Sequence, residues 1–328
     1  MARTLILPFE HPDRPSLALA PMAGITDRVF RDLCRENGAD YAVSEMVASK
    51  KHLWQSSKSA TRHADQTEAS PRMVQLLGTE PSELVEAALW QQSQGADVID
   101  LNMGCPAKKV CDVAAGSALM ADPERVSAIF NALVTALDIP VTVKIRTGVD
   151  KDHINALEIA QLAQQQGLKA VTLHGRTRAD KFQGQAEYDT IQTVTQTVTL
   201  PIIANGDICH PNDADFVLEY TGANGLMIGR AAQGYPWIFR EIRHYLTHKT
   251  QMPSPTRDEF RDVMIRHFVG LASLYGAEHG FKLARKHLGW YSQHLPEGAT
   301  LRQAFNALNT TQAQLDLVNR YFDALPIQ

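Results

Sequence analysis

The stretch VTVKIRTGVDKDHINALEIAQLAQQQGLKAVTLHG, from Val141 to Gly175, contains the pattern that decides the fold. It begins with a β-branched run, VTVKIR, and ends with a second short apolar run, AVTLHG. Between them, NALEIAQLAQQQ places apolar residues three and four apart, which is typical of an amphipathic helix. Gly167 follows this segment, where a helix is expected to end. The stretch therefore predicts two strands joined by one helix.

The same unit recurs along most of the chain. Short apolar or β-branched runs start at Leu17, Tyr41, Arg72, Val98, Val141, Ala170, Pro201 and Gly225. Their starts lie 24 to 43 residues apart, which leaves room for one helix and two loops each time. Eight buried parallel strands alternating with helices predict an α/β fold, a (β/α)₈ TIM barrel over residues 10–240. A doubly wound open sheet is the alternative, but it would need a GxGxxG turn after an early strand, which the sequence lacks.

Composition narrows the class of protein. The chain has 328 residues, 44% of them hydrophobic, and a net charge of −4, so it can bury a large core. It contains no run of about 18 apolar residues, and we expect no membrane span. Its four cysteines are scattered without a CxxC pair, which fits neither a disulfide framework nor a zinc site. We therefore expect a cytoplasmic protein without a metal, acting as a monomer.

After Tyr245 the character of the sequence changes. THKTQMPSPT contains two prolines and no apolar periodicity, and amphipathic helices without strand signals follow it. We therefore expect a barrel domain over 1–246, a linker over 247–255 and a small all-helical domain over 256–328. Residues 240–328 carry 11 Lys and Arg against 8 Asp and Glu, whereas residues 1–239 carry 21 against 28. A basic tail on an acidic body is compatible with an RNA partner, although ordinary helix surfaces also show such an excess.

Polar residues gather where the predicted strands end. Functional groups of a (β/α)₈ barrel project from the carboxyl ends of its strands, and polar side chains within apolar strands are costly unless paired. Seven of the eight strand ends carry such groups, which indicates a ligand at the mouth of the barrel. They are Ser44, Glu45, Gln75, Asn102, Cys105, Lys144, Arg146, His174, Arg176, Asn205, Asp207, Gly229 and Arg230.

The nature of these groups favours a phosphorylated, electron-rich ring as the ligand. Gly206, Gly229 and Arg230 stand in the two last strand-end loops, where barrels often bind a phosphate. Lys144 needs an anionic partner, and the N1–C2=O edge of a flavin would suit it. The alternative for Lys144 is a core ion pair with Glu45 or Asp100. Gln75 could bond a polar ring edge, and the loop at Pro21, Met22 and Ala23 offers backbone for a flat ring to pack on.

Cys105 stands in a Gly–Cys–Pro turn directly after the fourth strand. A free cysteine is usually a small buried apolar residue, but a turn at the mouth of a barrel makes that interpretation less favourable. A thiol with an ordinary pKa near 8.5 is protonated at neutral pH and can act as a general acid. Asn102 could hold a planar polar substrate beside it, whereas Cys111, six residues further on, is interpreted as structural.

Taken together, these motifs resemble the tRNA-dihydrouridine synthases, most nearly the bacterial B-type. The resemblance runs from Leu17 into the C-terminal helices, and the combination of NMGCPAKKV, HGRTR and NGDI is highly specific. It implies an FMN-containing (β/α)₈ barrel with a helical domain, which uses NADPH to reduce the C5–C6 double bond of particular tRNA uridines, expected in the D-loop. The family pattern has Asn after KKV, where this chain has Cys111.

The resemblance also implies roles for individual residues. Cys105 would protonate uracil C5 while flavin N5 delivers hydride to C6, and Asn102, Arg176 and Arg178 would contact the uracil or the RNA. Basic residues of the helical domain, above all Lys282, Arg285 and Lys286, would meet phosphates. The implied FMN contacts are Pro21, Met22, Ala23, Gln75, Lys144, His174, Asn205, Gly206, Asp207, Gly229 and Arg230.

Two other functions remain open from the sequence. A flavin barrel acting on a free pyrimidine would explain the mouth of the barrel but not the C-terminal helices. A non-catalytic RNA-binding module would keep the scaffold without a tightly held flavin. The sequence does not indicate which uridine is reduced, and it contains no nicotinamide-binding fingerprint.

Overall fold

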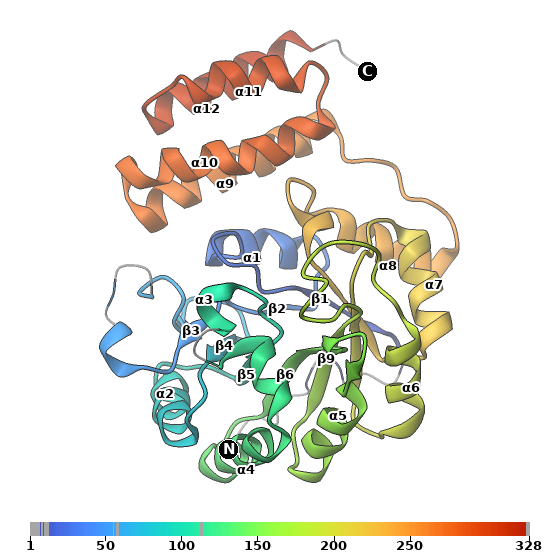
Figure 1. The fold of residues 1–328 in the computed structure, drawn as a ribbon. Coiled ribbons are helices and arrows are strands. Elements are labelled where there is room, and N and C mark those ends of the chain that lie inside the picture. The colour runs from blue at the N-terminus through green and yellow to red at the C-terminus, as the bar shows by residue number, and fades with distance from the viewer. Residues whose placement is uncertain are drawn as a thin grey trace.

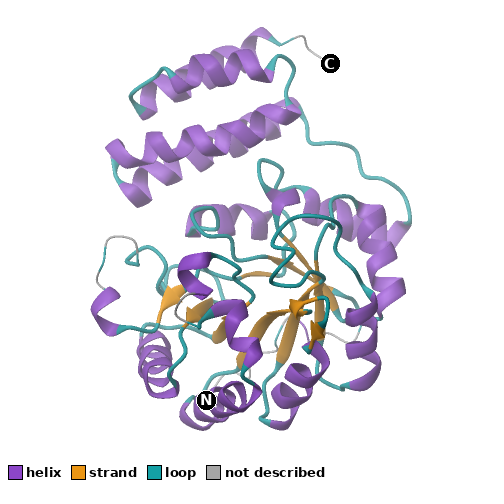
Figure 2. Ribbon diagram, viewed as in Figure 1, coloured by secondary structure: helices purple, strands orange, loops and turns teal. Residues whose placement is uncertain are grey.

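A computed structural model describes residues 7, 9, 13–54, 56, 59–111 and 114–325 of the chain. Within these residues, nine strands form one parallel sheet, drawn at the centre of Figure 2. Its order is β2-β1-β11-β10-β9-β6-β5-β4-β3. The strands are β1 (Ser16–Leu19), β2 (Tyr41–Ala42), β3 (Val47–Ala48), β4 (Met73–Leu77), β5 (Val98–Met103), β6 (Val141–Arg146), β9 (Ala170–His174), β10 (Ile202–Asn205) and β11 (Gly225–Ile228).

The sheet closes through its second strand, which is divided in two. The first half, β2, pairs with β1, and the second half, β3, pairs with β4. Between the halves, Val43 bridges to Met73 and the N–H of Ser44 donates to the carbonyl of Met73. The predicted (β/α)₈ barrel is thereby confirmed, with eight strand positions and the second one interrupted at 44–46.

Helices surround the barrel, as Figure 1 shows. They are α1 (Arg28–Glu36), α2 (Pro81–Ser93), α3 (Lys108–Cys111), α4 (Pro123–Ala136), α5 (Ala156–Gln165), α6 (Asp189–Thr197), α7 (Pro211–Thr221) and α8 (Ile238–His248). Short 3₁₀ helices lie at Lys51–Leu53, Gly116–Ala121, Arg230–Ala232 and Ser292–His294, and a small hairpin joins β7 (Gly148–Asp150) to β8 (His153–Ile154). Prolines begin α2, α4 and α7, as the sequence predicts, because their missing N–H costs nothing in the first turn.

The two-residue period of the strands sorts side chains into two layers. Leu17 and Leu19 of β1 belong to the large core between sheet and helices, whereas Ala18 belongs to a smaller core inside the barrel. The same alternation puts Lys144 and Arg146 on the inside of β6, since Val143 and Ile145 belong to the outer core. The inner face therefore changes along the strands from apolar residues such as Met73 to polar ones near the carboxyl ends.

Four further helices, α9 (Arg257–Tyr275), α10 (Ala277–Tyr291), α11 (Gly298–Asn306) and α12 (Thr311–Ala324), form a layer above the barrel in Figure 1. They share a hydrophobic core that also takes in Leu33 of α1 and Trp237. The division at 247–255 remains a proposal: α8 extends to His248, α9 begins at Arg257, and residues 326–328 of the expected helical domain lie outside the described part.

These C-terminal helices dock on α1. A Cβ at Gly270 would lie 2.5 Å from Val29, Phe30 stacks on His267, and Arg266 pairs with Glu36. At Gly234, with φ of 69°, a Cβ would lie 2.5 Å from the backbone of α10, so only glycine fits the loop after β11 there. The helical layer is thus packed directly onto α1, the helix that follows β1, and onto the loop after β11.

Within the described residues, no helix has the length and apolar character that crossing a bilayer requires.

Candidate functional site

A cavity of about 780 Å³ opens at the carboxyl ends of the barrel strands. The carboxyl ends of β1, β4, β5, β6, β9, β10 and β11 all contribute to its wall, and Met46, in the break of the second strand, lines it as well. Apolar and polar groups both face it, and its volume is within the range of cofactor sites.

The structure brings most of the predicted site residues to this one cavity. Those that line it are Pro21, Met22, Ala23, Gln75, Asn102, Cys105, Lys144, His174, Asn205, Gly206, Asp207, Gly229 and Arg230. Arg176, Arg178, Lys282, Arg285 and Lys286 do not. The alternation of side chains along each strand explains why the strand residues among them line the cavity, because each of these residues points inward.

A chain of buried hydrogen bonds crosses the floor of the cavity. Thr142 donates to Asp100 Oδ1 at 2.7 Å, and Gln75 Nε2 donates to Asp100 Oδ2 at 2.7 Å. Asn102 Nδ2 then donates to Gln75 Oε1 at 2.7 Å. Burial raises the pKa of Asp100, and its bonds to Gln75 and Thr142 oppose that rise. These bonds fix the orientation of the Gln75 and Asn102 amide groups.

Asn102 ends this chain by holding the Cys105 turn. Its Oδ1 accepts from the N–H groups of Gly104 at 3.2 Å and Cys105 at 3.0 Å. On the other side of the turn, the carbonyl of Cys105 accepts from Ser117 Oγ at 2.9 Å. The backbone of Cys105 is therefore anchored on both sides while its side chain lines the cavity.

The environment keeps the Cys105 thiol protonated. Burial raises its pKa above the ordinary value, outweighing the backbone N–H of Ala107 and the charge of Arg146, which lower it. Lys108 and Lys109 are exposed in the one-turn helix α3 and are not among the causes. A neutral thiol at this position can donate a proton, which fits an acid better than a nucleophile.

Lys144 reaches the centre of the cavity from β6. Its Nζ donates to Asn205 Oδ1 at 2.8 Å, and among the described residues it makes no ion pair, so the expected alternative of a pair with Glu45 or Asp100 is not found. Burial lowers the pKa of Lys144 to about 7, and the neighbouring Arg146 adds to that effect. A lysine held so close to neutrality would gain strongly from an anionic ligand.

His174 stands beside Lys144 and shares its partner. Its Nδ1 lies 3.0 Å from Asn205 Oδ1, whereas its buried Nε2 has no hydrogen-bond partner among the described residues. Burial lowers the pKa of His174 to about 2, with further lowering by Lys144 and Arg146. The ring is therefore neutral and presents one unused polar atom in the site, which a bound ligand could satisfy.

Arg146, one of the polar residues expected at the strand ends, lines the cavity too, although the resemblance implies no contact for it. It is 3% exposed, donates to the carbonyls of Gly104 and Thr177, each at 2.7 Å, and its guanidinium carbon lies over the ring of Phe182, 5.6 Å from the ring centre. Burial and the neighbouring Arg176 lower its pKa to about 10. Its inward place on β6, two residues after Lys144, explains why it reaches the cavity.

Asp207 lies in the loop after β10 and forms ion pairs with two arginines. Its carboxylate pairs with Arg176 at 2.5 Å and with Arg230 at 2.9 Å, and it accepts from the N–H of Ala186. Burial raises its pKa, but the Ala186 N–H and the two guanidinium groups more than offset this, so the carboxyl is ionised. Gly206 precedes it with φ of 132°, and a Cβ there would lie 2.7 Å from Ala186, so the backbone can pass only as glycine.

Arg176, which we expect to contact the substrate, does not line the cavity. It is 2% exposed, and it donates to the carbonyls of Gln183 and Gly184 besides pairing with Asp207. In this arrangement Arg176 supports the loop beneath the cavity wall, and a substrate contact remains a prediction. Arg178 is half-buried outside the lining.

The three basic residues of α10 have different surroundings. Lys282 is exposed beside Phe281, and Arg285 donates to the Leu308 carbonyl at 2.9 Å. Lys286 Nζ donates to the carbonyl of Gly24 at 2.9 Å, next to the loop of Pro21, Met22 and Ala23. Lys286 therefore ties α10 to the rim of the cavity.

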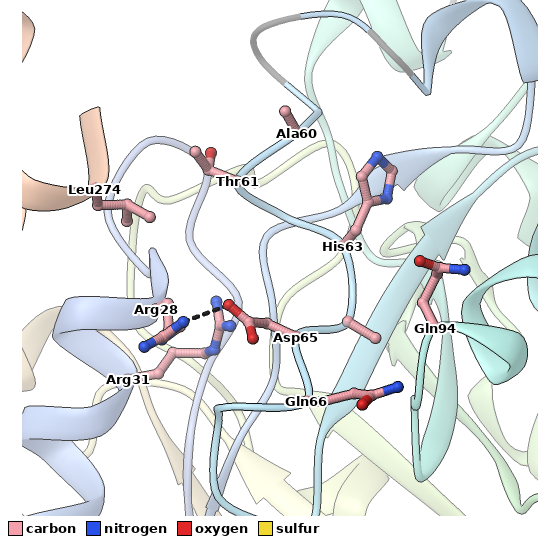
Figure 3. A pocket seen from close by; sticks show the side chains of 10 residues that line it. Arg28, Arg31, Ala60, Thr61, His63, Asp65, Gln66, Gln94 and Leu274 are labelled. Atoms are coloured by element: carbon pink, nitrogen blue, oxygen red, sulfur yellow. Dashed lines mark hydrogen bonds and ion pairs between the residues drawn. The ribbon is translucent and has the colours of Figure 1, made fainter. Parts of the chain in front are cut away.

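A second cavity, of about 310 Å³, lies between α1, residues 60–66 and Leu274 of α9 (Figure 3). Its two arginines are neutralised: Arg28 pairs with Asp65, and Arg31 donates to Glu68 at 2.7 Å. Within the described part of the chain, no cluster of three or more potential metal ligands occurs in either cavity. The larger cavity, where most of the predicted site residues lie, is therefore the candidate functional site.

Comparisons with known proteins show the family of the chain. The family model "Dihydrouridine synthase (Dus)" matches residues 18–325. The chain is 50% identical over 309 residues to "tRNA-dihydrouridine synthase B" of Pseudomonas putida, which covers 94% of this chain and 92% of the relative. It is 50% identical over 322 residues to the protein of that name from Pseudomonas aeruginosa, covering 98% and 96%.

A solved structure adds support for the fold alone. Histamine dehydrogenase from Rhizobium sp. 4-9 superposes with a TM-score of 0.52 at 10% identity, covering 79% of this chain and 48% of its own. The family model spans both the barrel and the C-terminal helices, and the sequence identities extend over nearly the whole length. The chain therefore belongs to the dihydrouridine synthase family, with the B-type enzymes among its relatives.

Proposed function

We propose that this protein is a tRNA-dihydrouridine synthase, which reduces the C5–C6 double bond of uridines in tRNA with FMN as cofactor and NADPH as reductant. One observation carries the proposal: Cys105, whose pKa burial raises, lines the same cavity as Lys144, whose pKa burial lowers to about 7, and as His174, whose buried Nε2 has no hydrogen-bond partner among the described residues. A thiol acid beside a site for an anionic ring is what flavin-driven reduction of a pyrimidine requires.

The residues present fit FMN. Lys144 offers a cation for the ring edge that becomes anionic on reduction, and His174, whose buried Nε2 has no hydrogen-bond partner among the described residues, lines the same cavity. Met22 and Ala23 give an apolar surface, and Met227 lines the cavity floor. Arg230, whose side chain is 59% exposed, and the glycine backbone at 206 and 229 suit a phosphate. When bound, FMN would supply the hydride for uracil C6.

Cys105 would supply the proton to uracil C5. The carbon that accepts this proton gains enolate character when hydride adds at C6, and a neutral thiol is an acid of fitting strength. The anchoring of the turn by Asn102 and Ser117 would hold the thiol in one place. A uridine in folded tRNA must leave its base stack to reach the cavity, and contacts inside the cavity would offset the free energy lost by unstacking.

Asn102 would act mainly through Cys105. Its Oδ1 and Nδ2 are both engaged, with the turn and with Gln75 respectively. A direct bond to uracil, as expected from the sequence, would use the remaining hydrogen of Nδ2. That group lies 3.9 Å from the Met46 sulfur, which is a weak acceptor easily displaced.

The helical layer would bind the RNA backbone. Among Lys282, Arg285 and Lys286 of α10, Lys282 is the most available for a phosphate, since the other two donate to backbone carbonyls. These bonds leave further N–H groups free on both side chains, so both would still attract phosphate. We also propose that the enzyme acts in the cytoplasm and as a monomer, because one chain supplies the whole described wall of the cavity.

Replacement of the thiol tests the proposal. We expect Cys105→Ala to lower dihydrouridine formation in unmodified tRNA at least about 100-fold, the usual contribution of a general acid. The visible absorption of bound FMN and its reduction by NADPH should remain. The matched control is Cys209→Ala, a cysteine on the exposed rim of the same cavity, which should keep activity.

Three outcomes would contradict the proposal. Near-wild-type dihydrouridine formation by Cys105→Ala would remove the acid role. A purified protein without a flavin spectrum would favour the non-catalytic alternative. Reduction of free uracil in preference to tRNA would favour the small-molecule alternative.

A further inference from the structure

A second thiol lies against the Cys105 turn. Cys111 ends the one-turn helix α3, and its Sγ lies 3.7 Å from the carbonyl oxygen of Cys105 and 3.7 Å from Ser117 Oγ. That carbonyl also accepts from the backbone N–H and the hydroxyl of Ser117. The chain between the two cysteines therefore folds back, so that the sulfur of one rests on the backbone of the other.

Gly116 shows how tightly this fold-back is packed. A Cβ there would lie 3.3 Å from Cys105 Cβ and 2.7 Å from Val110, the neighbour of Cys111. Cys105 Cβ and the end of α3 thus converge on the same backbone. A disulfide needs its two Cβ atoms about 4 Å apart, and a four-residue helix can shift to reach this at small cost because it holds few hydrogen bonds.

Exposure separates these cysteines from the other two. Cys105 and Cys111 are both partly exposed, so a small oxidant can reach them. Cys34 is fully buried, and Cys209 is exposed in the loop after β10. Only the pair around α3 combines access with a neighbouring thiol in direct contact with its turn, among the described residues.

We propose that Cys105 and Cys111 form a dithiol site that peroxide converts into an intrachain disulfide, which withdraws Cys105 from the cavity. This gives Cys111, which stands where the family pattern has Asn, a chemical role of its own.

The reaction balances with hydrogen peroxide as the oxidant. One cysteine, as its thiolate, attacks a peroxide oxygen, the O–O bond breaks, and a sulfenic acid and water form. The second thiol then attacks the sulfenic sulfur, the S–O bond breaks, and a second water leaves. Two thiols and one peroxide thus give one disulfide and two waters, and the two electrons pass from sulfur to peroxide.

Two consequences follow. Burial raises the pKa of Cys105, so the thiolate is scarce at neutral pH, and disulfide formation should be faster at pH 9 than at pH 7. The loss of turnover on oxidation rests on the proposed function, since it requires Cys105 to be the acid, whereas formation of the bond does not.

The experiment treats the full-length protein, as purified with its flavin, with a molar excess of hydrogen peroxide, and then blocks remaining thiols with iodoacetamide. We expect the mass before blocking to fall by two hydrogens and non-reduced peptide mapping to link Cys105 to Cys111. Dithiothreitol should reverse the change. Cys209→Ser should form the same bond, whereas Cys111→Ser should not. In each variant, the dihydrouridine activity of the oxidised form is compared with that of its own reduced form.

The outcomes separate the two proposals. If no Cys105–Cys111 bond forms, or if Cys105 goes instead to a sulfinic acid or to a bond with Cys209, the dithiol site is wrong and the proposed function stands. If the bond forms and activity falls at least about tenfold, reversibly and only when Cys111 is present, both are supported. If the bond forms and activity persists, the dithiol site stands and the acid role of Cys105 is wrong.

Discussion

Replacing Lys144 by Met should change how the stability of the flavin-free protein depends on pH. Burial and the charge of Arg146 lower the pKa of Lys144 from 10.5 to about 7 in the folded chain. In the unfolded chain the lysine keeps its ordinary pKa. Between the two values the unfolded state binds one more proton, so the stability of the wild type rises as pH increases from about 7.

The magnitude follows from that window. At about 1.4 kcal/mol per pKa unit, raising the pH from 6 to 9 should increase wild-type stability by about 3 kcal/mol through this group. We expect about half, 1–2 kcal/mol, because water enters the cavity that Lys144 faces and screens its charge. Loss of the bond to Asn205 costs the variant about 1 kcal/mol at both pH values and cancels in the comparison.

Urea unfolding at pH 6 and pH 9 measures this difference. Lys144→Met should be more stable relative to wild type at pH 6 than at pH 9, by about 1–2 kcal/mol. Lys108→Met, an exposed lysine on the rim, is the matched control and should show no such change. A second readout is calorimetric titration of FMN at pH 8 in buffers of different ionisation enthalpy. The wild type should take up a proton as the anionic ligand binds, and Lys144→Met should not.

The reasoning would be refuted by equal stability differences at the two pH values, or by proton uptake when FMN binds to the variant. Either result would mean that Lys144 is not the group poised near neutrality in the cavity.

Two further predictions test the parts around the cavity. Asn102→Ala should lower the free energy of unfolding by about 2–3 kcal/mol in urea titrations and should also reduce dihydrouridine formation. The reason is that the substitution leaves the N–H groups of Gly104 and Cys105 and the Gln75 oxygen unpaired. Unchanged stability and turnover would show that the Cys105 turn does not depend on Asn102. Asp27→Asn should raise the melting temperature at pH 8 but not at pH 4. Burial raises the Asp27 pKa to about 6, so the stability that the protonated carboxyl contributes is present below about pH 4 and is lost as the pH rises through 6. Asn stays neutral at both pH values and still accepts from the Phe30 N–H. The expected gain at pH 8 is about 2 kcal/mol, and a variant less stable than wild type at that pH would contradict it.

The sequence determined the barrel and most of its inner wall. The recurrence of short apolar runs at helix-sized intervals requires parallel strands, and the two-residue period then fixes which side chains share the inner face. Gln75, Asn102, Lys144, His174 and Asn205 follow from that period alone, and the cavity contains all of them. Arg146 follows from it too, although its motif assigned it no role.

Only the tertiary structure decided what lies beyond the strand ends. Arg176 belongs to the HGRTR motif, and its side chain donates to loop carbonyls and to Asp207 without lining the cavity. Lys286 meets the Gly24 carbonyl across 262 positions of sequence. Strand alternation is a local rule of backbone geometry, whereas loop side chains go wherever distant segments present unpaired groups. Those partners exist only once the helices have packed against the barrel.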